Sequence, residues 1–427
     1  MAWAPTAAHA AANPATTHHH RSPDHEDESE EPMTNTEYVV DGMPTARSCP
    51  FSPPDELTAL RAEQPIVRMA YPDGREGWLV TGYDLAQEVL ANPAFSARHD
   101  LRSSPIPMGG KLGPAQPGIF IGMDPPDHTR YRKPLSRHFT VRRVRDLEPA
   151  IERITDACLD ALEAQGSPAD FMATFALPLP VLVICELMGA SADLAAELQK
   201  LRVPMLSPGA EPADVAHAAK RTSELMHDLV RERRAAPGGD LLSELIATGE
   251  LNDEELANLT FLMIIAGHET TANTIAMSVY LLLQDDAVRA SLGDGSQVDD
   301  RAVNELLRYL SVVQFVSRAA LADVELGGRT VRQGETVTIS TSAVNRDERR
   351  FAEPDTFHAE GAGVGNLAFG HGLHQCIGHN LARTEIRIAL GRLLGRFPGL
   401  RLAARPQDIA TREAMNTYGV TELPVRW

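Results

Sequence analysis

The segment that most constrains this chain surrounds one cysteine: residues 369–383 read FGHGLHQCIGHNLAR. Gly370 and Gly372 precede Cys376, so the backbone can make turns and close approaches there that side chains would forbid. Gly378 follows the cysteine, and the pattern after it predicts the start of a helix. The first N–H groups of a helix lack partners within it and favour an anion. Cys376 is therefore a candidate metal ligand in its thiolate form.

Three interpretations of Cys376 are open at this point. It can be an ordinary buried thiol, the commonest state of a free cysteine. It can belong to a zinc or copper site, because the loop also contains His371, His374 and His379. It can bind the iron of a porphyrin, in which case a thiolate ligand promotes cleavage of the O–O bond. The glycines favour the porphyrin, because a flat cofactor needs bare backbone, and the loop lacks the paired spacings of zinc modules.

A long helix is predicted over residues 251–284. Apolar residues recur there at helical spacing, at Leu259, Leu262, Met263, Ala266, Ile275, Val279 and Leu282. About thirty residues at ~1.5 Å each span roughly 50 Å. A helix of that length can cross a whole domain.

The middle of this helix has the sequence AGHETT, residues 266–271. Gly267 costs about 1 kcal/mol relative to alanine, and threonine hydroxyls compete for backbone carbonyls, so we expect the helix to loosen here. The small Ala266 and Gly267 would let it lie close over a planar cofactor. Glu269 and Thr270 offer an acid and a hydroxyl that can relay protons. A helix bend with a solvated Glu269 is the alternative.

Two further pairs of charged residues are spaced for one helical face. His128 and Arg132 lie four residues apart, after a turn that contains prolines, so together they could bind two carboxylates of a ligand. Without such a ligand they would belong to an exposed basic helix. Glu305 and Arg308 lie three residues apart, a spacing that is common in surface ion pairs.

Together these segments resemble the cytochrome P450 family in its soluble bacterial form, and the resemblance covers about nine-tenths of the chain. It implies a haem-thiolate monooxygenase that inserts one atom of dioxygen into a substrate. It implies haem b with Cys376 as the axial ligand, and proton delivery by Thr270 and Glu269. The residues expected to contact the cofactor are His128, Arg132, Ala266, Gly267, Arg318, Phe369, His374, Cys376 and Gly378.

The fold that this resemblance implies is mainly α-helical with small β-sheets. The long helix should lie over the haem, with the cysteine loop beneath it. Residues 39–427 are expected to form a single haem-thiolate monooxygenase domain. Strand patterns occur at residues 77–81 and 336–340.

The ion pair departs from the family's pattern in one respect. In the family, the residues that match Glu305 and Arg308 are buried and bound to a third basic residue, which should fall near Gly361. No arginine occurs between residues 350 and 383 of this chain. We expect Asn366 or His358 to replace it.

Composition limits the partners and the location. A formal net charge of -18 disfavours binding to nucleic acid or to an anionic membrane. Four scattered cysteines do not make a disulfide scaffold, which suits a reducing cytoplasm. No run of about 18 apolar residues predicts a membrane span. Residues 1–38 are polar and acidic, so we expect a disordered leader rather than a secretory signal. A cytoplasmic monomer is expected.

Electrons should come from a separate protein, because no G-x-G-x-x-G segment follows a strand pattern. A basic stretch, residues 130–145, lies within this acidic chain. Its cations could bind an acidic ferredoxin, which would act with its own reductase, or could form a solvated helix face. The residues concerned are Arg137, Arg142, Arg143, Arg145 and Arg387.

The substrate is predicted to be a mainly apolar small molecule, as in relatives that tailor secondary metabolites. The pocket positions implied by the resemblance are Ile264, Ile265, Val312, Val313, Phe315 and the segment from Met415 to Tyr418. Residues 103–118 and 203–212 could form mobile lids over it. A thiolate-haem ligand sensor, a non-oxygenating haem enzyme and a His/Cys metal-binding protein are the alternatives.

Overall fold

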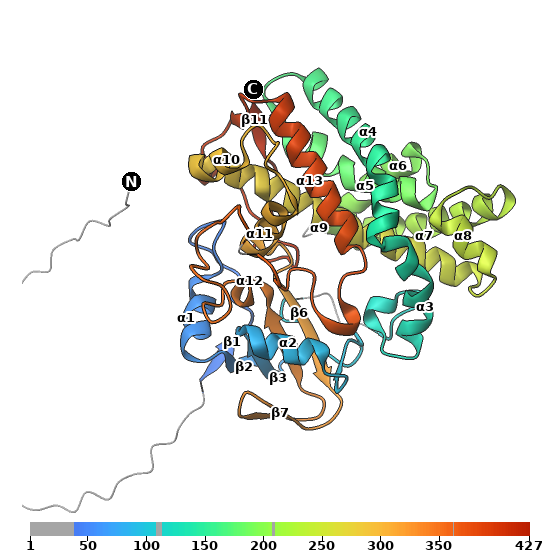
Figure 1. The fold of residues 1–427 in the computed structure, drawn as a ribbon. Helices are drawn as coiled ribbons and strands as arrows, with labels where there is room; N and C mark the ends of the chain where they lie inside the picture. Colours follow the sequence, from blue (N-terminus) through green and yellow to red (C-terminus); the bar gives the residue numbers. More distant parts are fainter. Residues whose placement is uncertain (1–37, 108–112, 207–209, 362) are drawn as a thin grey trace, which may run out of the picture. The chain divides into compact units, whose positions relative to one another are not determined.

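The structure is a computed structural model that describes residues 38–107, 113–206, 210–361 and 363–427. The expected leader, residues 1–38, lies outside this description except for its last residue, Tyr38. The described chain folds mainly into helices, with a β-sheet at one end (Figure 1). The predicted fold class is therefore confirmed.

Helices form the larger part of the molecule. The long helix predicted from residue 251 is α9, Asp253–Gln284. It begins at residue 253 because Asn252 caps it: the Asn252 side chain accepts from the Glu255 N–H, and the Glu255 carboxylate accepts from the Asn252 N–H. The other helices are α1 (Asp55–Glu63), α2 (Tyr83–Ala91), α3 (Asp127–Ser136), α4 (Val141–Gln165), α5 (Pro178–Met188), α6 (Ala192–Leu206), α7 (Pro212–Ala235), α8 (Leu241–Thr248), α10 (Asp286–Leu292), α11 (Asp300–Leu310), α12 (Thr341–Val344) and α13 (His379–Arg396).

The main sheet has the strand order β1-β2-β3-β9-β6-β4. Its strands are β1 (Val39–Asp41), β2 (Ile66–Ala70), β3 (Glu76–Val80), β9 (Thr336–Ser340), β6 (Phe315–Ala320) and β4 (Phe95–Ser96). The prediction of residues 336–340 matches β9, and that of residues 77–81 is one residue late for β3. Smaller sheets contain β5 (Ala169–Asp170), β10 (Arg401–Leu402) and β11 (Pro424–Arg426), and β7 (Val324–Leu326) with β8 (Arg329–Val331).

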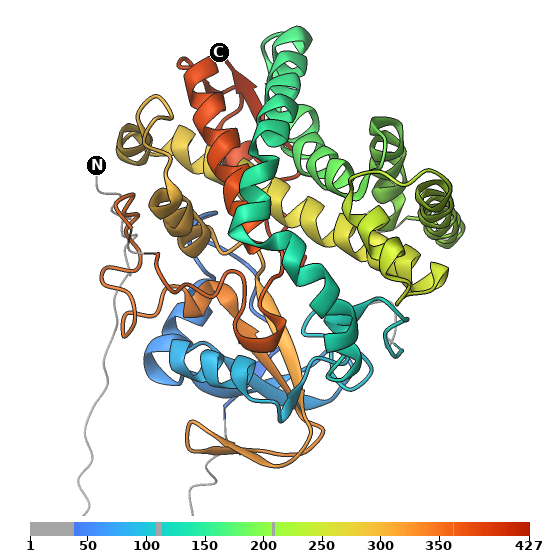
Figure 2. The same cartoon turned by 45° about the vertical axis from the view of Figure 1, so that its right-hand side comes forward.

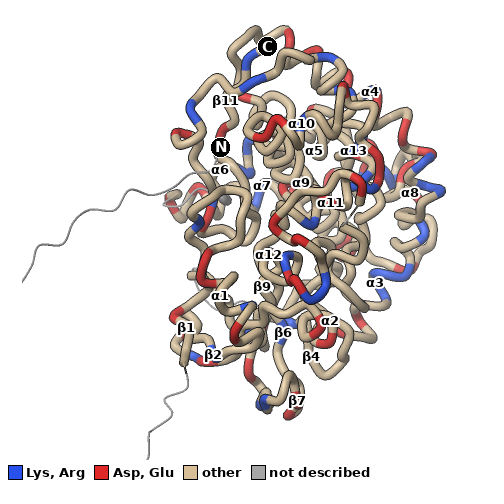
Figure 3. Tube along the Cα trace, turned by 60° about the vertical axis from the view of Figure 1, so that its left-hand side comes forward, with Lys and Arg blue, Asp and Glu red and all other residues tan. Residues whose placement is uncertain are grey.

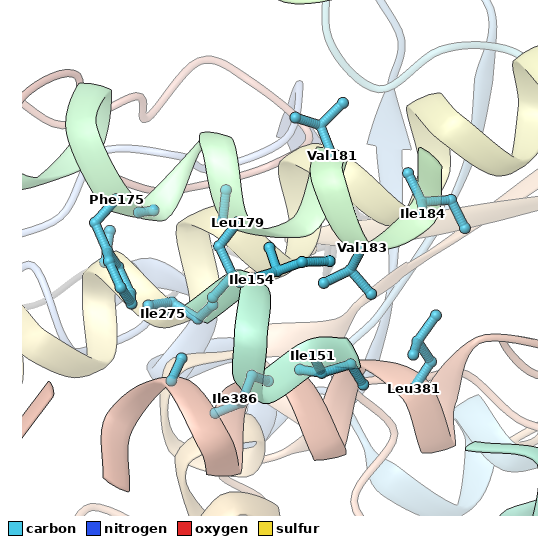
Figure 4. Packing of buried hydrophobic residues seen from close by; sticks show 14 of the residues in the cluster. Ile151, Ile154, Phe175, Leu179, Val181, Val183, Ile184, Ile275, Leu381 and Ile386 are labelled. Carbon is cyan, nitrogen blue, oxygen red and sulfur yellow. The ribbon is translucent and has the colours of Figure 1, made fainter. Parts of the chain in front are cut away.

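The apolar core lies where α4, α5, α9 and α13 meet. Figure 4 shows side chains from all four helices packed together, among them Ile151, Leu179, Ile275 and Ile386, which are all buried. Helix α13 lies beside α4 in both Figure 1 and Figure 2. Because α13 follows the cysteine loop directly, this packing fixes the loop against the core.

None of the helices in the described ranges is long and apolar enough to cross a membrane.

Candidate active site

The cysteine loop takes the shape that its glycines predict. Gly370 and Gly372 have φ angles of 68° and 69°, a left-handed conformation that side chains rarely adopt. A Cβ on Gly372 would lie 2.6 Å from the carbonyl oxygen of Leu90. The Cys376 N–H donates to the carbonyl of Phe369 at 2.8 Å, which closes the loop directly before α13. The Cys376 sulfur therefore lies at the amino end of a helix.

A cavity separates the cysteine loop from α9. Cys376 is exposed, but the surface that it exposes lines this cavity. The opposite wall is a stripe along α9, formed by Met263, Ala266, Gly267, Thr270, Thr271 and Thr274. These positions recur every three or four residues, as one face of a helix must. The structure thus places the predicted cysteine and the AGHETT segment on opposite sides of one space.

The thiol of Cys376 needs a positive charge to ionise. Although Cys376 is exposed to the cavity, its depth within the protein keeps it from bulk water and raises its pKa, while a hydrogen bond from the Gly378 backbone and the charges of Arg132 and Arg383 lower it. Burial outweighs these effects, so the protein alone favours the neutral thiol. A metal ion bound to the sulfur would reverse this balance, because a coordinating thiol is deprotonated.

A second group of residues is suited to carboxylates: His374 and Arg318 line the cavity, and His128 and Arg132 lie behind this lining. His128 is fully buried, and neither of its ring nitrogens has a hydrogen-bond partner. Its ring lies 4.2 Å from that of His374, centroid to centroid. Burial lowers the pKa of His128 to about 4 and that of His374 to about 3. A buried ring with two unpaired nitrogens is costly unless a ligand completes it.

Two arginines lie close to these histidines. Arg318 is 9% exposed and donates to the carbonyl of Ser317 at 3.0 Å. Arg132 donates to the carbonyl of Gln375 at 2.5 Å, beside the cysteine. Both charges contribute to the lowered pKa of His374. The group therefore has the charge and the free donors that a dianionic cofactor such as haem requires.

A zinc or copper site made of side chains finds no support here. Within the described ranges, no three His, Cys, Asp or Glu side chains converge to hold a metal ion. The histidines of the cysteine loop thus do not gather around Cys376. The remaining way for Cys376 to hold a metal is a cofactor that brings its own ligands, as a porphyrin does.

The AGHETT segment remains α-helical, contrary to the expected loosening. The hydroxyl of Thr270 donates to the carbonyl of Ala266 at 2.9 Å, without breaking the helix. The side chain of Glu269 is only 16% exposed, and its carboxylate accepts from Arg412 at 2.5 Å and from Arg202 at 3.5 Å. The alternative of a bent helix with a solvated Glu269 is therefore wrong.

The comparisons with known proteins agree with this geometry. The family model described as Cytochrome P450 matches residues 208–294 and 298–413. "Cytochrome P450 105C1" from Streptomyces sp is 43% identical over 90% of this chain and 97% of its own length. "Pentalenic acid synthase" from Streptomyces avermitilis is 38% identical over 93% of this chain and 100% of its own length. The crystal structure of CYP105P1 in complex with filipin I is 40% identical, has a TM-score of 0.83, and covers 91% of this chain and 99% of its own.

The chain belongs to the cytochrome P450 family. It is an oxidoreductase with the P450 fold and a haem-thiolate monooxygenase; one relative, "20-oxo-5-O-mycaminosyltylactone 23-monooxygenase" from Streptomyces fradiae, is 36% identical over 90% of this chain and 92% of its own length. The family uses a haem held by a cysteine thiolate, and its bacterial members receive electrons from redox partners. Unpaired His128, exposed Cys376 and the cavity between the loop and α9 fit such a group.

The ion pair between Glu305 and Arg308 is present and buried in this P450, but the third group that binds Glu305 is not a basic side chain. Glu305 and Arg308 are both fully buried, and Arg308 donates to both carboxylate oxygens of Glu305, at 2.7 and 2.8 Å. Glu305 also accepts from the backbone N–H of His358 at 2.9 Å. The side chain of Asn366 instead donates to the carbonyls of Asn304 and Gly363.

The prediction is therefore wrong for Asn366, whereas His358 does bind Glu305, although its side chain does not replace the third basic residue. The backbone N–H of His358 takes that place by donating to Glu305. The remaining N–H groups of Arg308 donate to the carbonyls of Asn345, Pro354 and Thr356. Because almost every residue type has a backbone N–H, the sequence cannot indicate which residue donates to Glu305 in this way.

Of the expected substrate-pocket residues, Val312 and Val313 line the cavity. Ile264, Phe315, Met415 and Tyr418 are not among the lining residues, and Ile265 is 40% exposed. Ile264 lies off the helical stripe and packs into the core. On β6, Val316 and Arg318 line the cavity. Side chains alternate between the two faces along a strand, so Phe315 lies on the opposite face of the sheet. Tyr418 is fully buried.

Sequence reasoning missed several residues at the site. Arg202 and Arg412 bind Glu269, although they are 67 and 143 residues away from it. Glu385 lines the cavity with one carboxyl oxygen unpartnered, and burial raises its pKa well above the usual range. Arg383 packs over Phe369. None of these positions has a spacing that would single it out in the sequence.

Proposed function

We propose that this P450 binds haem b with the Cys376 thiolate as the axial ligand and hydroxylates or epoxidises a mainly apolar small molecule. The observation that supports it best is the exposed thiol of Cys376 at a helix start, across a cavity from Ala266, Gly267 and Thr270. When bound, the haem supplies the binding and reductive cleavage of dioxygen. Phe369 would cover the sulfur, and Gly378 donates a backbone hydrogen bond to it.

The haem carboxylates would bind to His128, Arg132, Arg318 and His374. His128 has two ring nitrogens without partners, and the two arginines donate to neutral carbonyls. Two negative charges would convert these unmatched groups into charge-assisted hydrogen bonds. Haem carboxylates would therefore neutralise the positive charge of Arg132 and Arg318, which no carboxylate of the described residues pairs with.

Protons would reach the site through Thr270 and Glu269. Because the Thr270 hydroxyl donates its hydrogen to the Ala266 carbonyl, its oxygen can accept a hydrogen bond from water in the cavity. Glu269 lies one residue before it, bound to Arg202 on α6 and to Arg412 near the carboxyl terminus. In this proposal Thr270 binds a water molecule near the reaction site, and Glu269 supplies protons to that water.

The substrate would face an apolar wall. Ile184, Met263, Val312, Val313 and Val316 line the cavity. Such a wall binds by burial of apolar surface, with few polar groups to set orientation. "Nocardicin C N-oxygenase" from Nocardia uniformis is 40% identical to this chain, and its name gives a secondary metabolite as the substrate. We propose a substrate of that broad class.

The electron donor would be an acidic ferredoxin that binds near the cysteine loop. Arg137, before α4, and Arg142 and Arg145, at its start, are exposed, and none of them forms an ion pair with a carboxylate within the part of the chain that the structure describes. Arg143 and Arg387 are instead paired with Glu244 and Glu148, at 2.6 and 2.8 Å. In Figure 3, basic residues colour part of the trace beside α3, next to this region. The proposed contact is therefore smaller than the five arginines expected.

The test of the function is the spectrum of the reduced protein with carbon monoxide. Wild-type protein, expressed with haem supplied, should show the thiolate-type band of the family. The substitution Cys376→His should abolish that band, while Cys49→Ser, at a half-buried cysteine away from the cavity, should preserve it. A wild-type protein without haem absorption, or a Cys376→His protein with an unchanged band, would contradict the proposal.

A further inference from the structure

We propose that Arg383 positions the cysteine loop and acts as a counter-charge to the Cys376 thiolate, so that it raises the reduction potential of the bound iron. This inference rests on the proposed function. It assigns a role to a residue on α13 that neither binds dioxygen nor contacts substrate. Its basis is the set of contacts around the guanidinium.

The guanidinium of Arg383 lies on the aromatic residue of the cysteine loop. Its central carbon is 4.7 Å from the centroid of the Phe369 ring. Phe369 lines the cavity together with Cys376, and its carbonyl accepts the N–H of Cys376 at 2.8 Å. A cation over an aromatic face is attracted to the ring. Arg383 thus fixes the residue that holds the cysteine backbone.

Neutral groups hold Arg383 in this place. Its Nε donates to the Asn304 side chain at 2.8 Å, and its Nη1 lies 2.8 Å from His379 Nδ1 and 3.2 Å from the His379 carbonyl. Among the described residues Arg383 forms no ion pair with a carboxylate, and the charge of Asp300 acts on it only from beyond ion-pair distance. The side chain is half-buried, so solvent screens its charge only in part. Its positive charge therefore remains available to the thiolate.

The electrostatics of the cysteine support this arrangement. The side-chain charges that act on the Cys376 sulfur are those of Arg132 and Arg383, and both favour its anionic form. Arg132 has a second task at the cofactor carboxylates, whereas Arg383 has none. An added electron makes the metal centre more negative, and a nearby fixed cation stabilises that state. Removal of the Arg383 charge should therefore lower the reduction potential.

Helix α13 offers a matched control. Arg392 lies on the same helix, but its guanidinium is paired with Asp156 at 2.7 Å and with Glu152 at 2.9 Å. Its charge is neutralised by these carboxylates of α4. Substitution of Arg392 thus changes the formal charge of α13 as much as substitution of Arg383 does. Only Arg383 is in contact with the cysteine loop.

The experiment compares wild-type protein with Arg383→Gln, Arg383→Lys and Arg392→Gln. The reduction potential is measured by spectroelectrochemical titration at one pH, and the fraction of thiolate-type carbon monoxide complex is measured in parallel. Arg383→Gln should shift the potential to a more negative value and lower that fraction. Arg383→Lys, which retains the charge, should recover most of the potential, and Arg392→Gln should match wild type.

The other outcomes separate this inference from the proposed function. Equal potentials in Arg383→Gln and Arg392→Gln would overturn the inference while the wild-type spectrum still supports the haem. Equal loss in Arg383→Gln and Arg383→Lys would overturn the counter-charge role, because packing alone would explain it. A wild-type protein without haem would overturn the proposed function and this inference with it. Thermal melting checks that each variant is folded.

Discussion

At the scale of single residues, the site is marked by polar side-chain atoms that have no partner within the protein. Cys376 exposes its sulfur to a cavity, and His128 buries two nitrogens without partners. Thr270 directs its hydrogen to the helix and its oxygen toward the cavity. A stable core without a ligand would pair such groups. Their combination at one cavity is therefore what marks the site.

Thr270→Ala tests the proton relay at the scale of one hydroxyl. The variant should bind haem normally but divert electrons from product to hydrogen peroxide, because water near the site loses its acceptor. The ratio of peroxide formed to electrons consumed should rise several-fold, about 1 kcal/mol or more in relative barriers. Peroxide and product are measured during turnover with a ferredoxin and reductase. Thr260→Ala is the control, since Thr260 makes the same bond to the carbonyl four residues earlier, away from the cavity. Unchanged coupling would remove Thr270 from the relay.

At the scale of elements, one buried carboxylate joins the start of α9 to the middle of α3. Glu255 accepts hydrogen bonds from Arg130, from the Tyr131 hydroxyl at 2.8 Å and from the backbone of Asn252. Helix α3 carries His128 and Arg132, and α9 carries Thr270. Glu255 thus holds the helix of the carboxylate-binding residues against the helix of the proton relay.

This junction predicts a pH-dependent stability. Hydrogen bonds from Arg130, together with the Asn252 backbone and Tyr131, lower the pKa of Glu255 to about 2 although burial opposes them. A lowered folded-state pKa stabilises the fold above the unfolded value of about 4.3, and that stability is lost as pH falls toward the folded value. Glu255→Gln should cost about 2 kcal/mol at pH ~7 and clearly less at pH ~3. Urea unfolding at both pH values measures this.

The exposed neighbour Glu254 provides the control for that measurement. Glu254→Gln should change the free energy of unfolding little at either pH, because exposed charges contribute little. If Glu255→Gln lost the same stability at both pH values, the ionised carboxylate would not be the source.

The Glu305–Arg308 pair joins α11 to the chain before the cysteine loop. Arg308 is fully buried, and its planar, forked guanidinium donates hydrogen bonds to Glu305 and to three backbone carbonyls. Lysine keeps the charge but not the fork. Arg308→Lys should therefore destabilise the fold by about 3 kcal/mol, while Arg301→Lys, at an exposed residue of the same helix, should cost less than about 0.5 kcal/mol. Urea unfolding measures both, and equal losses would contradict the role of the fork.

At the scale of the whole molecule, charge is arranged in two ways. Helices α4 and α13 lie side by side, and an acidic stripe on α4 faces Arg392 and Arg396. These pairs use the basic residues of α13 within the fold. Arg142 and Arg145, at the start of α4, have no such pairs in the described residues and remain available to a partner.

The donor surface can be tested by charge reversal. Arg142→Glu with Arg145→Glu should weaken binding of an acidic ferredoxin at least ten-fold at low salt, with a smaller difference at high salt. Surface plasmon resonance at two ionic strengths measures this. Arg332→Glu, at an exposed residue of the sheet region, is the control. Equal binding by the double variant would place the donor elsewhere.

Much of this P450 could be predicted from local sequence. The cysteine loop follows from its glycines, α9 from apolar periodicity, and β9 from a strand pattern. These signals depend on residues a few positions apart, so the sequence carries them directly. The expectations for residues 1–37 and for the donor, location and oligomeric state remain predictions.

Only the tertiary structure decided the surroundings of these elements. Glu269 meets Arg412 across 143 residues, and Glu305 meets the backbone of His358 across 53. The choice of Val316 over Phe315 for the cavity wall depends on which face of the sheet lines the cavity. Contacts between distant segments, and donors that belong to the backbone, have no local sequence pattern. The sequence alone therefore determined the chemistry at Cys376, and packing determined which charges and walls surround it.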